Sequence, residues 1–195
     1  MRPRYRVQHF EQCALCRRPD VEGAVPVLAH DGRHSRYLEE HELDRLREQY
    51  THISLWSLLA APLLIGCPID KLDDFTLSLL TNDEVIDVNQ DPLGLQAAPI
   101  WRDGNSKVIY VKHLEDGSVA VGLFNRGEKP AEMKFTLRQL GMRGTKTIRD
   151  LWRQQDIATL ELGETYTAEV APHGVVLLKV GPGNPTERRV GKVER

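Results

Sequence analysis

The chain has 195 residues, of which 41% are hydrophobic and 28% are charged, as in an ordinary globular protein. Its 26 Lys and Arg against 28 Asp and Glu give a formal net charge of -2, which lacks the basic excess of a general nucleic-acid binder. The length suits one large domain or two small ones, and it excludes a complete eightfold βα barrel, which takes about 250 residues.

The longest apolar stretch, Ile53 to Cys67, contains two serines, Pro62 and Gly66. It is shorter than the ~20 apolar residues that cross a bilayer, so we expect no membrane span and no membrane partner. The N-terminus is basic but has no apolar segment behind it, so no export signal is expected there. Three cysteines leave one thiol unpaired, which favours a reduced state and leaves the compartment open.

Residues 1–47 have glycines and prolines that interrupt any long periodicity, and we interpret them as an irregular N-terminal segment. Within it, Cys13, Cys16, His30 and His34 have a spacing that falls in the range of zinc sites. A finger-type site places both histidines on a helix, whereas here Asp31 and Gly32 separate them. We therefore expect that these four residues bind no metal, and we expect no cofactor.

A helix is predicted from about Tyr37, because Leu43, Leu46, Tyr50 and Ile53 repeat on one helical face. Its second half is apolar nearly all round and needs cover on several sides, and Pro62 is expected to stop it. The short apolar run Pro62 to Gly66 then predicts a strand buried on both faces, as in a parallel sheet.

A second helix is expected next, capped by Asp70 or Asp73 and interrupted at Thr81-Asn-Asp, with a further apolar turn at Glu84 to Val88. Asn89 to Gly94 has the composition of a turn that ends this element. Helix, strand and helix in this order indicate part of a βα-repeat architecture.

From residue 96 onward, apolar residues recur at every second position, which is the period of a β-strand. The segments 107–114 and 118–124 flank Asp116-Gly117, which predicts a β-hairpin with a tight turn. Five further strands are predicted at 131–137, 145–151, 156–162, 165–170 and 175–180, and their regular spacing is typical of an antiparallel sandwich. The fold class is therefore α+β, a barrel remnant followed by a β-sandwich. Residues 181–195 are predicted to be a disordered tail.

Two groups of residues suggest chemistry. The neighbouring carboxylates Asp73-Asp74 and Asp83-Glu84 point about 100° apart on a helix, so helix capping explains them better than acid/base catalysis. Four aromatic residues of the β-region could either pack in the core or form a platform on which a sugar stacks. Aromatic residues of strands more often pack in the core. These four are Trp101, Tyr110, Trp152 and Tyr166. His113 and His173 are expected at the surface or in turns.

Longer runs of the sequence resemble a known family. Glu48 to Cys67, with its Ala-Pro-Leu-Leu-Ile-Gly run, resembles the late barrel region of glycoside hydrolase family 27, the α-galactosidases and α-N-acetylgalactosaminidases. Leu79 to Gly94, with Asn-Gln-Asp-Pro-Leu-Gly, resembles the last barrel helix and exit turn of that family. Asp150-Leu-Trp152 and Pro172-His-Gly174 resemble its C-terminal β-domain. The resemblance covers residues 48–180.

Composition and the resemblance together divide the chain into four regions. These are the irregular segment 1–47, the last part of a βα barrel at 48–95, a β-sandwich at 96–180 and the tail 181–195. Within the second, the resemblance implies that Tyr50 to Ala61 is barrel helix seven, that Leu63 to Gly66 is strand eight and that residues 73–89 are helix eight.

The resemblance also implies an α-galactosidase that cleaves terminal α-galactosyl groups with retention, with α-galactosides as its substrates. The two catalytic Asp residues of the family lie on earlier barrel strands and have no counterpart here, and the Trp-Asn-Asp-Pro-Asp substrate motif is absent. Pro68 also stands where the family more often has Asp.

No catalytic, cofactor-binding or metal-binding residue is therefore assigned, and this chain alone is expected to be inactive. The exposed barrel remnant suggests self-association. The alternative is a self-standing β-sandwich that binds carbohydrate or a partner subunit.

Overall fold

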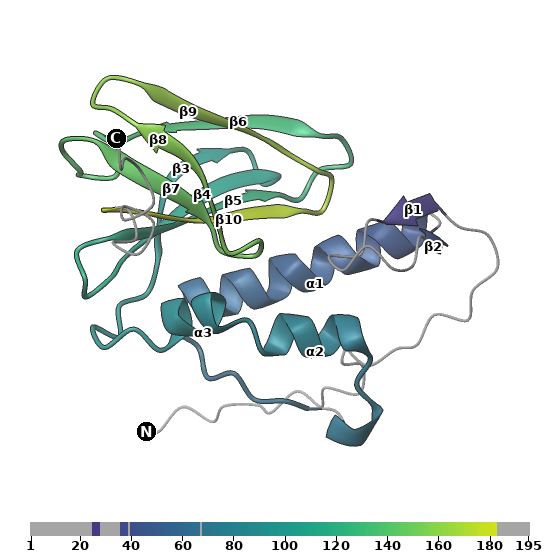
Figure 1. Ribbon diagram of the computed structural model, residues 1–195. Coiled ribbons are helices and arrows are strands. Elements are labelled where there is room, and N and C mark those ends of the chain that lie inside the picture. The colour runs from purple at the N-terminus through teal and green to yellow at the C-terminus, as the bar shows by residue number, and fades with distance from the viewer. Residues whose placement is uncertain (1–24, 28–35, 39, 67, 183–195) are drawn as a thin grey trace, which may run out of the picture.

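The computed structural model describes residues 25–27, 36–38, 40–66 and 68–182 (Figure 1). The four residues with zinc-like spacing, and the predicted tail beyond Pro182, lie outside the described residues. Two short strands, β1 (Val25–Val27) and β2 (Arg36–Leu38), pair antiparallel within the segment that was expected to be irregular. None of the helices in the described part of the chain is long and apolar enough to cross a membrane.

The first helix, α1 (Glu40–Leu58), forms where the apolar periodicity predicts it. It ends before Pro62, because Ala60 adopts a left-handed backbone conformation with φ of 49°. Ile53 and Leu58 are buried, as expected for the apolar second half of this helix.

The strand expected at Pro62 to Gly66 is not formed. These residues follow an irregular path, and the side chain of Leu64 is 88% exposed. Their backbone makes no hydrogen bond with the described residues. A strand buried on both faces needs neighbours on both edges, and none of the described strands lies beside this segment.

The region 73–89, which the resemblance implies to be one helix, is divided at the break that the sequence pattern predicts. After the 3-10 turn η2 (Ile69–Lys71), α2 (Asp74–Leu80) and α3 (Asp83–Asn89) are separated by Thr81 and Asn82. The Asp73 carboxylate accepts a hydrogen bond from the Thr76 amide, which confirms Asp73 as a cap. The Asn82 side chain does the same for the Val85 amide, so a new cap begins a new helix.

The seven strands predicted in the β-region are all present, and β3, which the periodicity did not reveal, precedes them. All pairings are antiparallel, and the hairpin at Asp116-Gly117 is confirmed by the register of β4 and β5. The strands are β3 (Ala98–Asp103), β4 (Lys107–His113), β5 (Val119–Asn125), β6 (Ala131–Thr136), β7 (Lys146–Asp150), β8 (Gln155–Leu160), β9 (Thr165–Val170) and β10 (Val175–Gly181).

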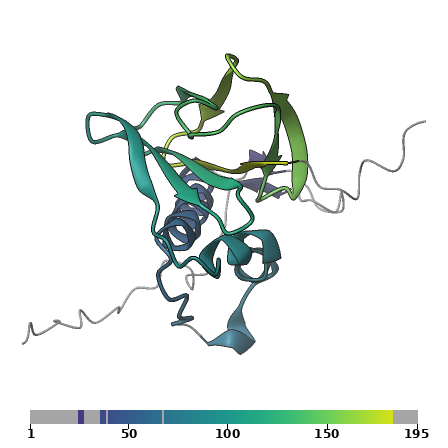
Figure 2. The same cartoon turned by 90° about the vertical axis from the view of Figure 1, so that its left-hand side faces the viewer.

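The strands form two layers. One sheet has six strands in the order β3-β4-β5-β10-β7-β8, and the other consists of β6 and β9. One core fills the space between these sheets and includes Met133, Phe135 and Leu178. A second core covers the opposite face of the six-stranded sheet, where α1 and α3 pack (Figures 1 and 2). The expected barrel remnant is therefore anchored on the sandwich through shared apolar side chains.

Candidate functional site

Neither predicted carboxylate pair forms an acid/base site. Asp73 caps α2, and Asp83 accepts hydrogen bonds from the Glu84 amide and the Gln154 side chain. Glu84 is not a capping residue, because both of its oxygens accept from Arg149 at 2.6 and 2.8 Å. These carboxylates therefore join elements of the fold.

The four aromatic residues do not gather on one surface. Tyr110 packs edge-on against Phe124 in the core below the six-stranded sheet, whereas Tyr166 packs on Phe135 in the core between the sheets. Trp152 contacts Tyr50 and donates its indole N–H to Ser54 on α1 at 2.9 Å. Of the four aromatic side chains, only Trp101 is exposed, at 37%, and the other three are half-buried. A common sugar-stacking platform is therefore excluded.

The histidines lie where they were expected. His113 is exposed at the end of β4. His173 lies in the turn between β9 and β10, where its backbone has φ of 52° and its ring lies 3.2 Å from Glu128. Its carbonyl accepts a hydrogen bond from Thr51 of α1 at 2.9 Å, so this turn also holds the helix.

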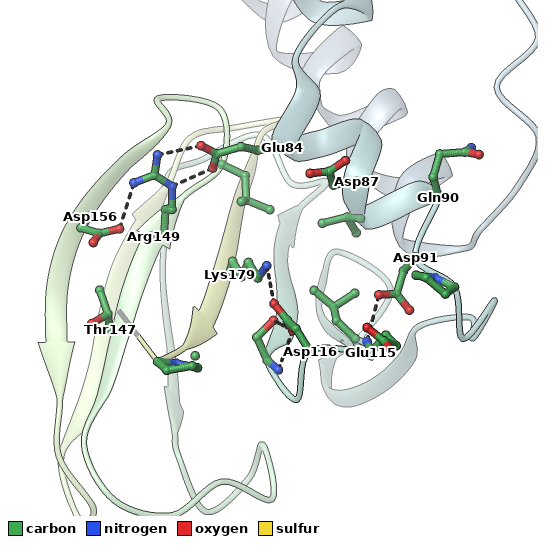
Figure 3. Close-up of a pocket in the computed structure, with 17 residues that line it drawn as sticks. Glu84, Asp87, Gln90, Asp91, Glu115, Asp116, Thr147, Arg149, Asp156 and Lys179 are labelled. Atoms are coloured by element: carbon green, nitrogen blue, oxygen red, sulfur yellow. Dashed lines mark hydrogen bonds and ion pairs between the residues drawn. The ribbon is translucent and has the colours of Figure 1, made fainter. Parts of the chain in front are cut away.

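A groove runs between α3, the β4–β5 turn and the strands β7 and β10 (Figure 3). Its volume is about 780 Å³. Its lining includes six carboxylates and two cationic side chains, so the groove is acidic. These charged residues are Glu84, Asp87, Asp91, Glu115, Asp116, Asp156, Arg149 and Lys179.

Arg149 lies at one end of this groove, beside Glu84 and Asp156 (Figure 3). Its guanidinium binds Glu84 of α3 with two hydrogen bonds and Asp156 of β8 at 3.0 Å. The hydrogen bonds with Glu84 raise the pKa of Arg149 above its ordinary value. Charge-assisted, bidentate pairs of this kind are strong and directional, so Arg149 fixes α3 against the sheet.

Lys179 and Asp116 form the second ion pair of the groove, at 2.8 Å. Burial raises the pKa of Asp116, but hydrogen bonds from Lys179 and Ser118 outweigh this effect and hold the pKa below its usual value. Both cations of the groove are thus already paired. Glycoside hydrolysis with retention needs one protonated and one ionised carboxyl facing the same bond, and these salt-bridged carboxylates do not supply that arrangement.

A metal site is not apparent either, since residues 40–66 and 68–182 hold no group of three His, Cys, Asp or Glu side chains placed to share an ion.

Asn89 and Asp91, in the Asn-Gln-Asp-Pro-Leu-Gly run, have structural roles. Asn89 is buried and donates to the carbonyl of Ala61 at 2.8 Å and that of Trp56 at 3.4 Å. Asp91 accepts from the Glu115 amide in the β4–β5 turn. The run therefore connects the end of α1 to the sandwich.

The other run, Asp150-Leu-Trp152, has the same role. The Leu151 amide bonds to Leu177 of β10, and its carbonyl accepts from Asn82 at the start of α3. Trp152 reaches α1 through Ser54. The runs that carry the family resemblance thus converge on the junction between helices and sandwich.

Lys112 is a buried residue that sequence reasoning missed. Its side chain has 0% exposure, and its ammonium group donates to the carbonyls of Val88, in α3, and Ser57, near the end of α1. Burial lowers its pKa, although Asp91 opposes this effect. The sequence pattern of β4 does not indicate that Lys112 is buried, because an exposed lysine would fit the same alternation.

Comparisons with known proteins agree with this geometry. Residues 104–180 match the family described as "Alpha galactosidase C-terminal beta sandwich domain". The chain is 39% identical over 142 residues to the "Probable alpha-galactosidase" of Dictyostelium discoideum, covering 70% of this chain and 36% of that protein. It is 37% identical over 138 residues to the α-galactosidase of Cyamopsis tetragonoloba, covering 69% and 33%.

Solved structures give the same result. α-Galactosidase I of Mortierella vinacea superposes with a TM-score of 0.65 at 26% identity, covering 80% of this chain and 38% of that one. A family 27 β-L-arabinopyranosidase of Geobacillus stearothermophilus superposes with a TM-score of 0.65 at 29% identity, covering 88% and 36%.

The chain is homologous to the C-terminal part of the family 27 α-galactosidases. It spans about a third of the length of these relatives. The predicted resemblance and the α+β class, with helices followed by an antiparallel sandwich, are confirmed. In this α-galactosidase homologue the family match begins at Gly104 and covers the strands from β4 to β10, while α1 to α3 and β3 precede it.

Proposed function

We propose that the chain serves as the C-terminal part of an α-galactosidase, a hydrolase of terminal α-galactosyl groups, and that the catalytic carboxylates belong to the remaining barrel. The observation that carries this proposal is an exposed apolar surface beside a well-covered sandwich. Six of the nine large hydrophobic side chains exposed in the described chain fall between residues 64 and 95. Four of them, Leu64, Ile65, Ile69 and Leu77, form what we call the apolar surface.

The apolar surface belongs to α2 and to the segment that leads into it from α1. This region lies on the side of the molecule that faces away from the sheets (Figure 1). Leu64 is 88% and Ile69 is 70% exposed, whereas the helix residues on the sandwich side, such as Leu58 and Val88, are buried. Several large apolar side chains exposed within one short stretch of chain are typical of a surface that another protein segment covers.

The backbone of residues 62–66 supports a barrel as the covering segment. This run is continuous in apolar residues, and its amides and carbonyls make no hydrogen bond with the described residues. A neighbouring parallel strand on each edge would pair these groups, and the barrel interior would take up the side chains. The relatives' additional length is large enough to contain such strands, because the chain spans only 36% of the Dictyostelium protein.

The domain boundaries follow from the same reasoning. We assign residues 48–95 to the barrel and residues 96–180 to the sandwich, with 1–47 and 181–195 outside both. This boundary falls within α1, whose residues from Glu48 onward belong to the barrel part together with α3. Both helices also pack on the sandwich, and Lys112 and Arg149 join the two parts.

Two measurements test the proposed function. The chain alone, purified free of host α-galactosidase, is expected to show no turnover of an aryl α-galactoside. A separately produced N-terminal part of the Dictyostelium relative, ending before the segment that matches residue 48, is expected to bind the chain and to gain activity with it. Turnover by the chain alone would show that it contains its own catalytic groups. Failure of a soluble barrel part to bind would contradict the assignment of the apolar surface.

We infer also that, without a barrel, two copies of the chain associate through the apolar surface. The same exposed side chains support this, since a second copy offers an equally apolar face.

A further inference from the structure

Two Asp-Gly pairs lie in turns at the two ends of β4. Asp103-Gly104 precedes the strand and Asp116-Gly117 follows it. Both glycines have a left-handed backbone, with φ of 55° and 76°, and open space where a side chain would stand. The side chains of Asp103 and Asp116 are 58% and 51% exposed. Exposure and backbone conformation therefore do not distinguish the two turns.

An Asp-Gly pair can undergo a reaction within its own backbone. The Gly amide nitrogen attacks the carbon of the Asp side-chain carboxyl group, and a C–N bond forms while the amide proton and the carboxyl OH leave as water. The product is a five-membered succinimide ring. Water then adds to the former main-chain carbonyl carbon and opens the ring to isoaspartate, so that atoms balance and no cofactor is needed. Glycine favours the attack because it places no side chain beside the amide.

The turn at Asp116 holds both reacting groups. The Gly117 amide donates to the Leu114 carbonyl at 3.1 Å. One Asp116 oxygen accepts from the amide and the hydroxyl of Ser118, and the other is paired with Lys179 at 2.8 Å (Figure 3). These partners stabilise the ionised carboxylate, whose oxygen is a poor leaving group. Cyclisation at this turn would have to break several of these bonds.

The turn at Asp103 leaves the same groups accessible. The Gly104 amide makes no hydrogen bond with the described residues. The Asp103 carboxylate is paired with Lys107 at 2.9 Å, and an exposed ion pair of this kind contributes little and opens easily. Because β3 is an edge strand, Asp103 is also held by β4 alone, and the turn can change shape without disturbing a second neighbour.

We propose that Asp103-Gly104 is a site of spontaneous covalent modification, at which Asp103 converts to isoaspartate, and that its hydrogen bonds protect Asp116-Gly117 from the same reaction. Isoaspartate adds a methylene group to the main chain, which removes residue 103 from its register with Lys107 at the end of β3. The product also has a free α-carboxylate, the group that an isoaspartyl carboxyl methyltransferase takes as its substrate. A third pair, Asp31-Gly32, lies outside the described residues.

Peptide mapping of the full chain tests this proposal, because trypsin separates the two pairs into peptides 103–107 and 113–126. The chain is aged at neutral pH, and isoaspartate in each peptide is measured with an isoaspartyl methyltransferase and labelled S-adenosylmethionine. Peptide 103–107 is expected to gain isoaspartate about ten times faster, which corresponds to about 1.4 kcal/mol in activation free energy. In urea, where both turns are unfolded, the two rates are expected to be similar.

Lys179→Met and Lys107→Met form a matched pair of variants, since each removes the cation beside one Asp. Lys179→Met is expected to raise the rate at Asp116 severalfold. Lys107→Met is expected to change the rate at Asp103 by less than about twofold, because that exposed ion pair contributes little. Ser118→Ala gives a second way to release Asp116, and circular dichroism checks that all variants are folded.

Two results would overturn the proposal. One is equal rates in the two peptides of the folded chain. The other is an unmodified peptide 103–107 after a period in which the chain in urea has converted. An unchanged rate at Asp116 in both Lys179→Met and Ser118→Ala would contradict protection by these hydrogen bonds. The sites lie in the sandwich, so none of these results bears on barrel binding by the apolar surface.

Discussion

At the scale of single residues, Lys112 shows how a charged side chain can organise a core. It is among the largest fully buried side chains in the described chain. The last carbonyls of a helix have no partner within the helix, and a cation near that end is favoured by the helix dipole. Lys112 supplies donors to the carbonyls of Val88 and Ser57, and so one strand residue fastens both α1 and α3.

Lys112→Met keeps most of the side-chain volume but removes these donors. We expect the free energy of unfolding to fall by about 1–3 kcal/mol, the cost of leaving a buried carbonyl unsatisfied. Urea denaturation at pH 7 measures this. Lys129→Met, at an exposed loop position, is the control and is expected to change stability by less than about 0.5 kcal/mol.

The pH dependence of the same variant gives a second prediction. Burial lowers the pKa of Lys112 in the folded chain, so between that value and the unfolded value of about 10.4 the unfolded state binds more protons. The stability contribution of Lys112 therefore rises as pH increases toward 10. The raised pKa values of Tyr50 and Tyr166 act in the opposite direction but are common to both proteins. The stability difference between the unmodified chain and Lys112→Met is expected to grow with pH, and a constant difference would contradict a lowered pKa.

At the scale of elements, the docking of α1 depends on one glycine. A Cβ atom at Gly122 of β5 would lie 2.5 Å from Leu58 and 2.6 Å from Phe124. The helix can approach the sheet this closely only because position 122 has no side chain. Leu58, at 0% exposure, fills the space above it.

Gly122→Ala is therefore expected to destabilise the chain by about 1–3 kcal/mol, through overpacking between helix and sheet. Gly66→Ala is the matched control, because Gly66 has open space around it and is expected to change stability by less than about 0.5 kcal/mol. Thermal unfolding of both variants gives the comparison. Equal stability of the two would mean that α1 can move away from β5 without loss.

The same scale shows what the sequence could and could not predict. The β4–β5 hairpin was predictable, because the alternation of apolar residues and the Asp-Gly turn are local signals. The strand at 62–66 was predicted and is not formed, since a strand depends on neighbours that local pattern does not supply. β3 was missed because Pro99 and the bulge disrupt its alternation. The ion pairs of the groove join Arg149 to Glu84 and Asp156, which belong to two other elements, and a local pattern does not show that such distant residues meet.

At the scale of the whole molecule, the sandwich and the helix layer differ in how much of their apolar surface is covered within the chain. The sandwich buries its aromatic and aliphatic residues on both faces of the larger sheet. The helix layer is covered on the side of the sheet and exposed on the other, where Leu64 and Ile69 lie in the open. The sequence pattern assigned Leu64 to a buried strand, whereas it made no assignment for Ile69.

This asymmetry predicts concentration-dependent association. The chain is expected to elute larger than its 22.1 kDa monomer and to bind a hydrophobic dye, because association removes the apolar surface from water. The double variant Leu64→Lys, Ile69→Lys is expected to elute as a monomer, whereas Leu162→Lys, at the sandwich edge, is expected to behave as the unmodified chain does. A monomeric elution volume for the unmodified chain across a hundredfold concentration range would show that the surface stays uncovered.

Hydrogen exchange distinguishes the two parts of the molecule directly. The amides of Leu63, Leu64 and Ile65 make no hydrogen bond with the described residues and are expected to exchange rapidly in a dilute monomer. Those of Val119 to Leu123 lie in a central strand paired on both sides and are expected to exchange slowly. If a barrel part pairs with the run at 62–66, the first group becomes protected while the second is unchanged. Slow exchange at residues 63–65 in the dilute monomer would mean that this run is already covered within the chain, and the apolar surface would then need no partner.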